Sequence, residues 1–440
     1  IQKDLGLSEA NLQWIVNAYT LVFGGFLLLG GRAGDLLGRK RLFLIGLVIF
    51  TAASLLNGLS SSSGQLIGFR ALQGLGAALI SPAALSIIST TFAEGKERAR
   101  ALGVWAAIAI GGSAFGLVLG GWLTQSFSWP WIFFVNVPVG VFAFVATFRL
   151  VPESKDEHAH HGYDIGGAVT VTGGLMTLVY AIVKAETDGW GSTTTLGLFL
   201  AALALLVSFV FIEMRSKEPL VRLSIFKTRS LLTANLTMFL VGTGFFAMFF
   251  FITLYLQKVL GYHPLTSGLS ALPFTGGIMI SAGLASGLAP RIGVRPVAAV
   301  GMVLTAIGML LFARMPVGGS YATDVLPGMI VASLGLGAVF MPLTLVATTG
   351  LKDEDQGLAS GLFNTSQQIG GALGLAILST VAAGETHGGS KAALVHGFHY
   401  AFAGGAVFVL AGLVVMLALL RKRDVARIEA EASSASPVAA

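Results

Sequence analysis

Long apolar segments dominate the chain, and each is bounded by charged residues or by clusters of glycine, proline and serine. The hydrocarbon core of a bilayer needs about 20 apolar residues in one helix. Thirteen segments approach that length, and the connections between them are too short for a separate soluble domain. The pattern predicts an all-α integral membrane protein with spans at residues 11–31, 42–60, 65–90, 101–123, 130–150, 164–184, 194–213, 231–256, 267–288, 296–314, 325–348, 357–382 and 397–420.

Positive residues alternate between the predicted connections and indicate an orientation, because Lys and Arg are retained on the cytoplasmic side. Of 27 such residues, 21 fall on one side, Arg70 lies inside a span, and five fall on the other side: Lys3, Lys184, Lys258, Arg314 and Lys391. The C-terminus is therefore expected to be cytoplasmic, with a disordered tail over residues 423–440, and residue 1 to be external. An external N-terminus without Met suggests that one preceding span is missing, so that thirteen spans are present and fourteen are inferred.

The composition narrows the class of protein. Apolar residues make up 55% of the chain and charged residues 11%, against about 25% charged in a soluble domain. The net charge of +6 reflects membrane topology rather than nucleic-acid binding. Zero cysteines exclude a disulfide scaffold and a thiol-based site, and no phosphate-binding loop is present. We expect no cofactor, no metal and no enzymatic activity; His158, His160 and His161 are interpreted as part of a solvated connection.

Glycine patterns recur at a nearly constant offset, as in transporters built from two related halves. The matches are Gly103, Gly112 and Gly116 with Gly361, Gly370 and Gly374 at 258 residues, residues 74–77 with 335–338 at 261, and, more weakly, Gly38 with Gly293. The predicted organisation is an N-terminal half over 1–150, a linker with two inserted spans over 151–225, and a C-terminal six-helix half over 226–422.

Several motifs resemble those of the major facilitator superfamily. Residues 31–40 (GRAGDLLGRK) resemble its loop signature between the second and third spans, residues 70–76 (RALQGLG) its fourth-span motif, and residues 112–121 (GSAFGLVLGG) its antiporter motif. With the inserted hairpin, the chain resembles the 14-span drug:proton antiporter family of bacterial multidrug exporters. It departs from the family pattern at Leu36, at Leu117 and at residues 129–131 (WPW).

The loop signature is expected to act as a conformational switch, through Gly31, Asp35, Gly38, Arg39 and Lys40. A carboxylate is stabilised near the N-terminus of another helix, and in the family the partner of Asp35 is the span that begins here near Gly357. By the same logic, Arg39 could pair with Glu94 or Glu97. The alternative is that these charges serve topology alone.

Arg70 is predicted to be a buried charge that takes part in proton coupling, with Gln73 one turn away on the same face. Its partner would lie in the missing span, where the family carries an Asp. The alternative is that Arg70 extends to the membrane surface.

Glycines at i, i+4 spacing in the antiporter motif predict a close-packed seam that opens and closes between the halves: Gly112, Gly116, Gly120 and Gly121. Candidates for the substrate cavity are aromatic or polar residues inside spans: Trp14, Tyr19, Phe245, Phe249, Asn364, Gln367 and Gln368. The polar residues are equally compatible with helix–helix contacts, and the phenylalanines with lipid contacts.

The leading hypothesis is a secondary active transporter that exports amphiphilic drugs or antibiotics across the bacterial cytoplasmic membrane by proton antiport. Its partners would be the substrate, protons and lipid but no nucleic acid, and it would be a monomer. The alternatives are an exporter or symporter of a defined metabolite, such as a peptide, amino acid or siderophore, and a transport-dead membrane sensor.

Overall fold

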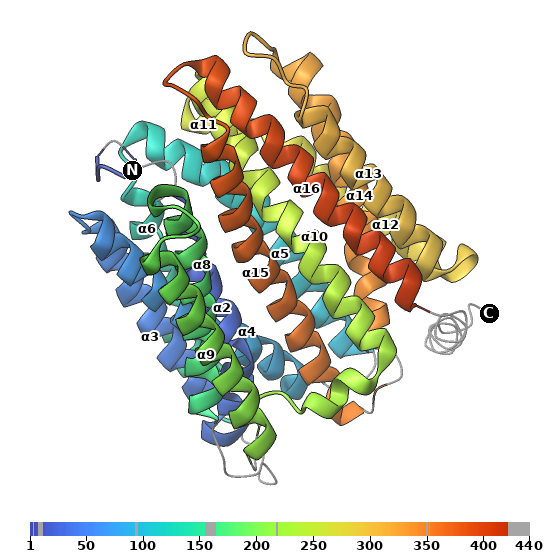
Figure 1. Cartoon of the computed structure of the whole chain (residues 1–440). Coiled ribbons are helices and arrows are strands. Elements are labelled where there is room, and N and C mark those ends of the chain that lie inside the picture. Colours follow the sequence, from blue (N-terminus) through green and yellow to red (C-terminus); the bar gives the residue numbers. More distant parts are fainter. Residues whose placement is uncertain are drawn as a thin grey trace. The chain divides into compact units, whose positions relative to one another are not determined.

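A computed structural model describes residues 1–2, 4–7, 12–92, 96–154, 164–216, 219–348, 351 and 353–420. Every regular element within these ranges is a helix. Figure 1 shows the helices coloured along the chain. Two compact units divide the chain, Ile1–Arg222 and Leu223–Ala440, and each is described by itself.

The N-terminal unit is a set of long helices joined by short connections. They are α2 (Trp14–Leu37), α3 (Arg39–Gly58), α4 (Ser63–Thr91), α5 (Lys96–Ser126), α6 (Trp131–Phe134), α7 (Asn136–Leu150), α8 (Ile165–Asp188) and α9 (Thr193–Arg215). Side-chain caps fix where several of them begin. Ser62 accepts a hydrogen bond from the Gln65 amide at the start of α4, and Ser192 accepts one from Thr195 at the start of α9. Such caps satisfy backbone donors that a helix leaves unpaired.

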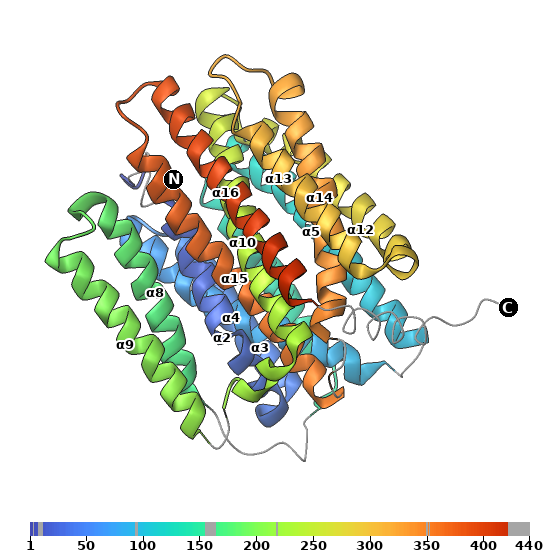
Figure 2. The same cartoon turned by 45° about the vertical axis from the view of Figure 1, so that its right-hand side comes forward.

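The C-terminal unit contains the remaining elements. They are η1 (Leu223–Lys227), α10 (Arg229–Leu254), η2 (Tyr255–Val259), α11 (Pro264–Ser270), α12 (Leu272–Ile292), α13 (Val294–Phe312), η3 (Tyr321–Val325), α14 (Leu326–Thr348), α15 (Asp353–Gly384) and α16 (Lys391–Leu419). Figure 2 shows α10, α15 and α16 side by side within this unit. The guanidinium groups of Arg229 and Arg295 donate to the carbonyls of Leu419 and Leu417, and thereby stabilise the last turn of α16.

The prediction of an all-α membrane protein is confirmed. Within the described residues, 12 helical segments are long and apolar enough to cross a membrane. The one remaining predicted span, 101–123, lies within α5. Many side chains of α5 are outside the described part of the chain. Each predicted span therefore falls on a helix, although some helices continue beyond the apolar segment that predicts them.

The largest difference concerns the expected loop over residues 31–40. The structure shows two helices there, because α2 continues to Leu37 and α3 begins at Arg39. Only Gly38 separates them, and its φ of 102° is in the region that L-residues with a Cβ avoid. Polarity predicts a loop at this point, but a single glycine is enough to reverse the chain.

Equivalent glycines make equivalent contacts in the two units. Gly293, between α12 and α13, has a φ of 92° and repeats the role of Gly38. A Cβ on Gly76 of α4 would lie 3.0 Å from the Gly46 carbonyl on α3. A Cβ on Gly335 of α14 would lie 2.5 Å from the Gly301 carbonyl on α13. The glycine spacing predicts that Gly76 corresponds to Gly337. These contacts instead make Gly76 correspond to Gly335, two residues earlier.

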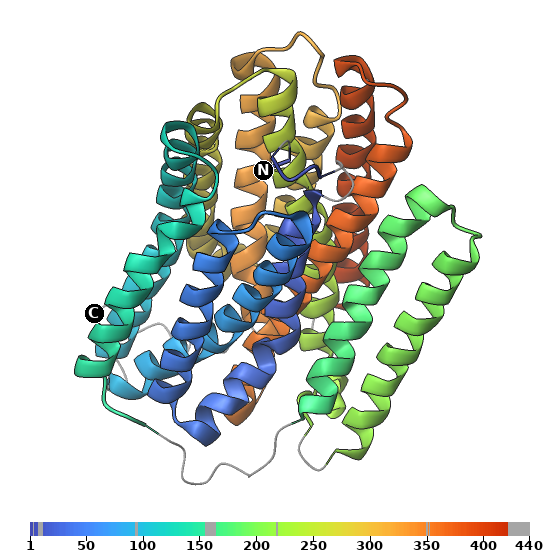
Figure 3. The ribbon, with the colours of Figure 1, turned by 90° about the vertical axis from the view of Figure 1, so that its left-hand side faces the viewer.

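Within the N-terminal unit, the hairpin α8–α9 packs on α2 through α8 (Figure 3). Trp14 of α2 contacts Tyr180 of α8, with ring centroids 6.2 Å apart. Gly174 brings α8 close to Leu206 of α9. In contrast, α9 exposes large apolar side chains, including Leu200 at 66% and Met214 at 70%. A helix with this surface is suited to contact with lipid.

Candidate functional site

Arg70 lies in the predicted span of α4 and is held by neutral groups. Its Nε donates to the Ile15 carbonyl at 2.8 Å, and its Nη1 donates to Gln73 Oε1 at 2.7 Å. The guanidinium carbon lies 4.4 Å from the centre of the Tyr19 ring and 5.9 Å from that of Phe133. Cation–π contact and charge-assisted hydrogen bonds stabilise a cation removed from water. Among the described residues, no carboxylate forms an ion pair with Arg70.

Gln73 connects Arg70 to helix α3 through a buried hydrogen-bond network. Its Nε2 donates to Ser54 Oγ at 2.7 Å, and its Oε1 also accepts from Asn57 Nδ2 at 3.2 Å. Gln73 is 2% exposed, and Ser54 and Asn57 are fully buried. Buried networks of this kind fix one arrangement of the helices, since each lost partner leaves an unpaired polar group. Asn57 Oδ1 has no hydrogen-bond partner among the described residues.

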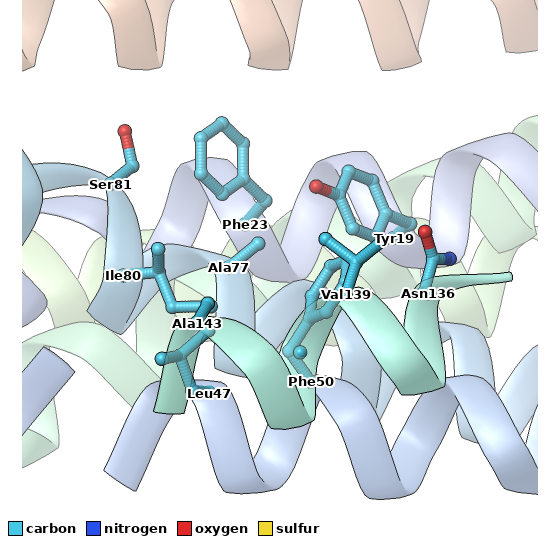
Figure 4. A pocket seen from close by; sticks show the side chains of 11 residues that line it. Tyr19, Phe23, Leu47, Phe50, Ala77, Ile80, Ser81, Asn136, Val139 and Ala143 are labelled. Atoms are coloured by element: carbon cyan, nitrogen blue, oxygen red, sulfur yellow. The ribbon is translucent and has the colours of Figure 1, made fainter. Parts of the chain in front are cut away.

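An open pocket of about 420 Å³ has Tyr19 in its wall, the residue whose ring also contacts Arg70 (Figure 4). Aromatic rings line part of it, since Tyr19 stacks on Phe23 at 5.9 Å and Phe50 lies nearby on α3. Two polar side chains, Ser81 and Asn136, also face it. The remaining lining is small or aliphatic: Leu47, Ala77, Ile80, Val139, Gly140 and Ala143. An apolar wall with a few polar groups is typical of pockets that bind small amphiphilic molecules.

The predicted switch segment is held by a residue that lies far away in the sequence, Glu153. Its carboxylate accepts hydrogen bonds from the backbone amides of Lys40 at 3.1 Å and Arg41 at 3.2 Å, and Arg41 Nε lies 3.7 Å from it. The Lys40 ammonium donates to the Phe148 carbonyl at 2.9 Å. A carboxylate at the first turn of α3 satisfies unpaired amides and interacts favourably with the helix dipole. These contacts attach α3 to the end of α7.

Sequence reasoning missed Glu153, although a signal was available. Residues 152–154 (PES) directly follow an apolar span, and their carboxylate is on the same predicted side as the positive residues of 39–41. The predicted pairing of Arg39 with Glu94 or Glu97 stays a prediction: Glu97 is exposed, and Glu94 lies outside the described residues. The side chain of Asp35 is also outside the described part, while Gly31 belongs to α2.

The glycines of the antiporter motif lie on α5. Within the N-terminal unit, a Cβ on Gly112, Gly116 or Gly120 would meet no described atom within 4 Å. Their matched glycines on α15 are packed tightly, because a Cβ on Gly370 would lie 2.9 Å from Phe239 Cα and one on Gly374 would collide with Thr243. Gly121, on the same helix, is buried. The small face of α15 is thus a seam with α10, and a role for α5 in closure stays a prediction.

The aromatic candidates on α10 separate onto two faces. Phe245 and Phe249 meet Phe274 of α12, at 6.5 and 5.7 Å, and Phe245 also meets Phe340 of α14 at 6.1 Å. Phe251 instead packs into the core against Phe398 of α16 at 5.3 Å. Phe245 and Phe249 are half-buried and remain candidates for a cavity wall.

The polar candidates on α15 are half-buried: Asn364, Gln367 and Gln368. Within the C-terminal unit, no described side chain hydrogen-bonds with these three groups. Their neighbour Ser366 behaves differently, since its hydroxyl donates to Asn235 Oδ1 of α10 at 2.7 Å. Ser366 therefore joins helices, while the three amides remain available to a polar ligand or water.

Together, the features describe a membrane transporter: two helical units with repeated packing, a cation inside a predicted span, and an apolar pocket with few polar groups. The model of the Major Facilitator Superfamily matches residues 1–375, and the chain belongs to that family.

Curated relatives have names that refer to resistance and export. The chain is 38% identical over 450 residues to the puromycin resistance protein pur8 of Streptomyces alboniger, covering 99% of this chain and 89% of that protein. It is 39% identical to the cephamycin export protein CmcT of Amycolatopsis lactamdurans, covering 93% and 85%. It is 33% identical to the multidrug transporter protein MdtP of Bacillus subtilis, covering 87% and 70%.

Solved structures show the same fold at low sequence identity. A peptide transporter, POT, matches with a TM-score of 0.67 at 17% identity, covering 94% of this chain and 87% of that one. The nucleoside transporter NupG matches with a TM-score of 0.62 at 13% identity, covering 96% and 93%. The expected fold is confirmed, and at this identity the likeness concerns the fold alone.

Proposed function

We propose that the protein is a secondary active exporter of amphiphilic drugs or antibiotics that exchanges them for protons by alternating access. Export is supported by curated relatives at 33–39% identity, whose names refer to puromycin, cephamycin and multiple drugs. The proposed setting is the bacterial cytoplasmic membrane, with a monomeric protein and a cytoplasmic C-terminus.

The observation that carries proton coupling is the position of Arg70. A guanidinium inside a membrane span is costly and normally marks a functional site. Here Tyr19, whose ring contacts Arg70, also lines the pocket, and neutral acceptors at 2.7 and 2.8 Å hold the cation in place. A fixed positive charge makes it easier for a nearby acidic group to release a proton. Reversible proton uptake and release is what coupling to a proton gradient requires.

The available driving force is sufficient. Moving one charge through about 100 mV supplies about 2.3 kcal/mol, so an exchanged proton can sustain export against a gradient. The sequence contains no phosphate-binding loop that would support nucleotide-driven transport.

The experiment is transport by the purified protein in liposomes, with puromycin and a fluorescent lipophilic cation as substrates. With an imposed pH gradient, we expect substrate to move against the proton flux, and the movement to stop when the gradient is collapsed. Proton flux in the same direction as substrate would favour a symporter. An absence of flux for both probes, with the protein correctly folded, would argue against drug export.

A further inference from the structure

The hairpin α8–α9 has an open end, where α8 begins and α9 ends (Figure 3). Two carboxyl groups are buried there. Asp164 immediately precedes α8 and is 5% exposed, and Glu213 lies in the last turn of α9 and is 4% exposed. A buried carboxylate is costly unless a cation or hydrogen-bond donors compensate for the lost water. The transport features described above use neither residue.

Each carboxyl group has one satisfied oxygen and one unsatisfied oxygen. Asp164 Oδ1 accepts from the Gly167 amide at 2.6 Å and caps α8. Glu213 Oε2 accepts from the Val221 amide at 3.1 Å, and the Leu220 amide also acts on this carboxyl group, so that the connection after α9 is attached to the hairpin. The other two atoms, Asp164 Oδ2 and Glu213 Oε1, are buried and have no hydrogen-bond partner among the described residues. Unsatisfied buried oxygens are rare and require a physical explanation.

The two groups differ in their preference for charge. Asp164 lies at a helix N-terminus, where the dipole and the Gly167 amide favour a carboxylate. Glu213 lies at a helix C-terminus, where the dipole disfavours one. The Asp164 carboxyl group lies close to the end of α9, because a Cβ on Gly166 would lie 3.7 Å from Asp164 Oδ1 and 3.6 Å from Cδ1 of Ile212, the residue before Glu213. At this separation the charge of Asp164 acts on Glu213. Two interacting carboxyl groups in a buried site tend to retain one proton between them.

Among the described side chains, no nearby charged group supplies an alternative partner for the unsatisfied oxygens of Asp164 and Glu213. The Arg215 guanidinium lies 5.7 Å from the centre of the Phe211 ring, and neither Arg215 nor Arg222 is among the groups that act on Glu213. Within the described residues, no group of three or more His, Cys, Asp or Glu side chains could hold a metal ion. The side chains of four further charged residues, on α2 and in the connection, are outside the described part: Arg32, Asp35, Lys217 and Glu218.

We propose that Asp164 and Glu213 bind one proton together, so that the open end of the hairpin is a proton-binding site. In this arrangement Glu213 Oε1 carries the proton and donates it in a hydrogen bond to Asp164 Oδ2. A single O–H group satisfies both remaining oxygens and leaves one negative charge instead of two. Loss of the proton places two charges in the buried site and weakens the attachment of residues 219–222 to the hairpin. The site is distinct from Arg70 and does not depend on drug export.

The test is infrared difference spectroscopy of the purified protein in lipid at neutral pH. A protonated carboxyl group gives a C=O stretching band that carboxylates lack and that shifts in D₂O. We expect this band in the wild-type protein and its loss in Glu213→Gln, because only the anionic Asp164 then remains. Asp188→Asn, at the opposite end of the hairpin, is the matched control and keeps the band.

Thermal unfolding of the same samples provides a second measurement. Gln is nearly isosteric with protonated Glu and can donate to Asp164, so Glu213→Gln should unfold within about 2 °C of wild type, whereas Glu213→Ala should unfold at a lower temperature. The proposal is wrong if the wild-type protein lacks the band or if Glu213→Gln retains it. It is also wrong if Na⁺, K⁺ or Ca²⁺ at constant pH removes the band, since the pair would then bind a metal cation.

Discussion

At the scale of single residues, the geometry of Arg70 explains why arginine occupies this position. The guanidinium donates in two directions while its flat face contacts the Tyr19 ring at 4.4 Å. An ammonium group is a compact, strongly hydrated charge and cannot reproduce this planar arrangement. The shape of the cation therefore matters as well as its sign.

Arg70→Lys should lower the rate of proton-coupled transport by at least about tenfold, because a loss of about 1.5–3 kcal/mol is expected when a hydrogen bond to a charged group is removed. Arg70→Gln should abolish coupling. The measurement is substrate-dependent proton flux in liposomes at equal protein density. Wild-type flux in Arg70→Lys would show that the charge alone is sufficient.

Part of this site could be predicted from the sequence. The i, i+3 spacing of Arg70 and Gln73 predicts that they share a face, and they form a hydrogen bond at 2.7 Å. The contacts with Ile15 and Ser54 depend on how three helices pack, and periodicity does not encode that packing. For Glu153, the sequence indicates a carboxylate on the same side of the membrane as Lys40, but not their contact, since the two residues lie 113 positions apart in the chain.

At the scale of elements, single glycines and carboxylates determine where helices end and how closely they approach. Gly38 separates α2 from α3, and Glu153 then satisfies the first amides of α3. Hydropathy predicts the presence of both helices because burial in lipid requires apolar length. It does not predict their ends, since helix continuation into a charged segment depends on local backbone geometry.

Glu153→Ala should destabilise the N-terminal unit by about 0.5–2 kcal/mol, the range for loss of a helix-capping side chain. Glu153→Gln should have an intermediate effect, since one amide oxygen can still accept a hydrogen bond. The measurement is thermal unfolding in detergent. Glu97→Ala is the control, because Glu97 is exposed in the first turn of α5. Equal effects of both alanine variants would contradict the role of Glu153.

Gly370→Ala should destabilise the seam between α10 and α15 by about 1–3 kcal/mol, the usual cost of overpacking. The added methyl group would collide with the Phe239 carbonyl. Gly384→Ala on the same helix has open space and should be neutral or slightly stabilising. Thermal unfolding of the two variants distinguishes a packing effect from a general effect of alanine. Similar unfolding temperatures for both variants would contradict close packing between α10 and α15.

At the scale of the whole molecule, composition and repetition carry most of the information. A composition of 55% apolar and 11% charged residues indicates a protein embedded in the lipid bilayer. All thirteen predicted spans fall on helices. The glycine spacing predicts the repeat, but the predicted alignment of α4 with α14 is wrong by two residues. Glycines are too frequent in these helices to define an alignment. Substrate identity was not encoded in any motif, since pockets for amphiphilic molecules are built from common apolar side chains.

The central claim is that outward movement of drug is exchanged for inward movement of protons. It is tested most directly by measuring both fluxes together in liposomes that contain the purified protein, an internal pH-sensitive dye and a lipophilic cationic substrate. The account predicts that adding substrate on one side releases protons to that side, and that Arg70→Gln eliminates this exchange. Substrate movement without proton movement, or with protons moving in the same direction, would contradict it.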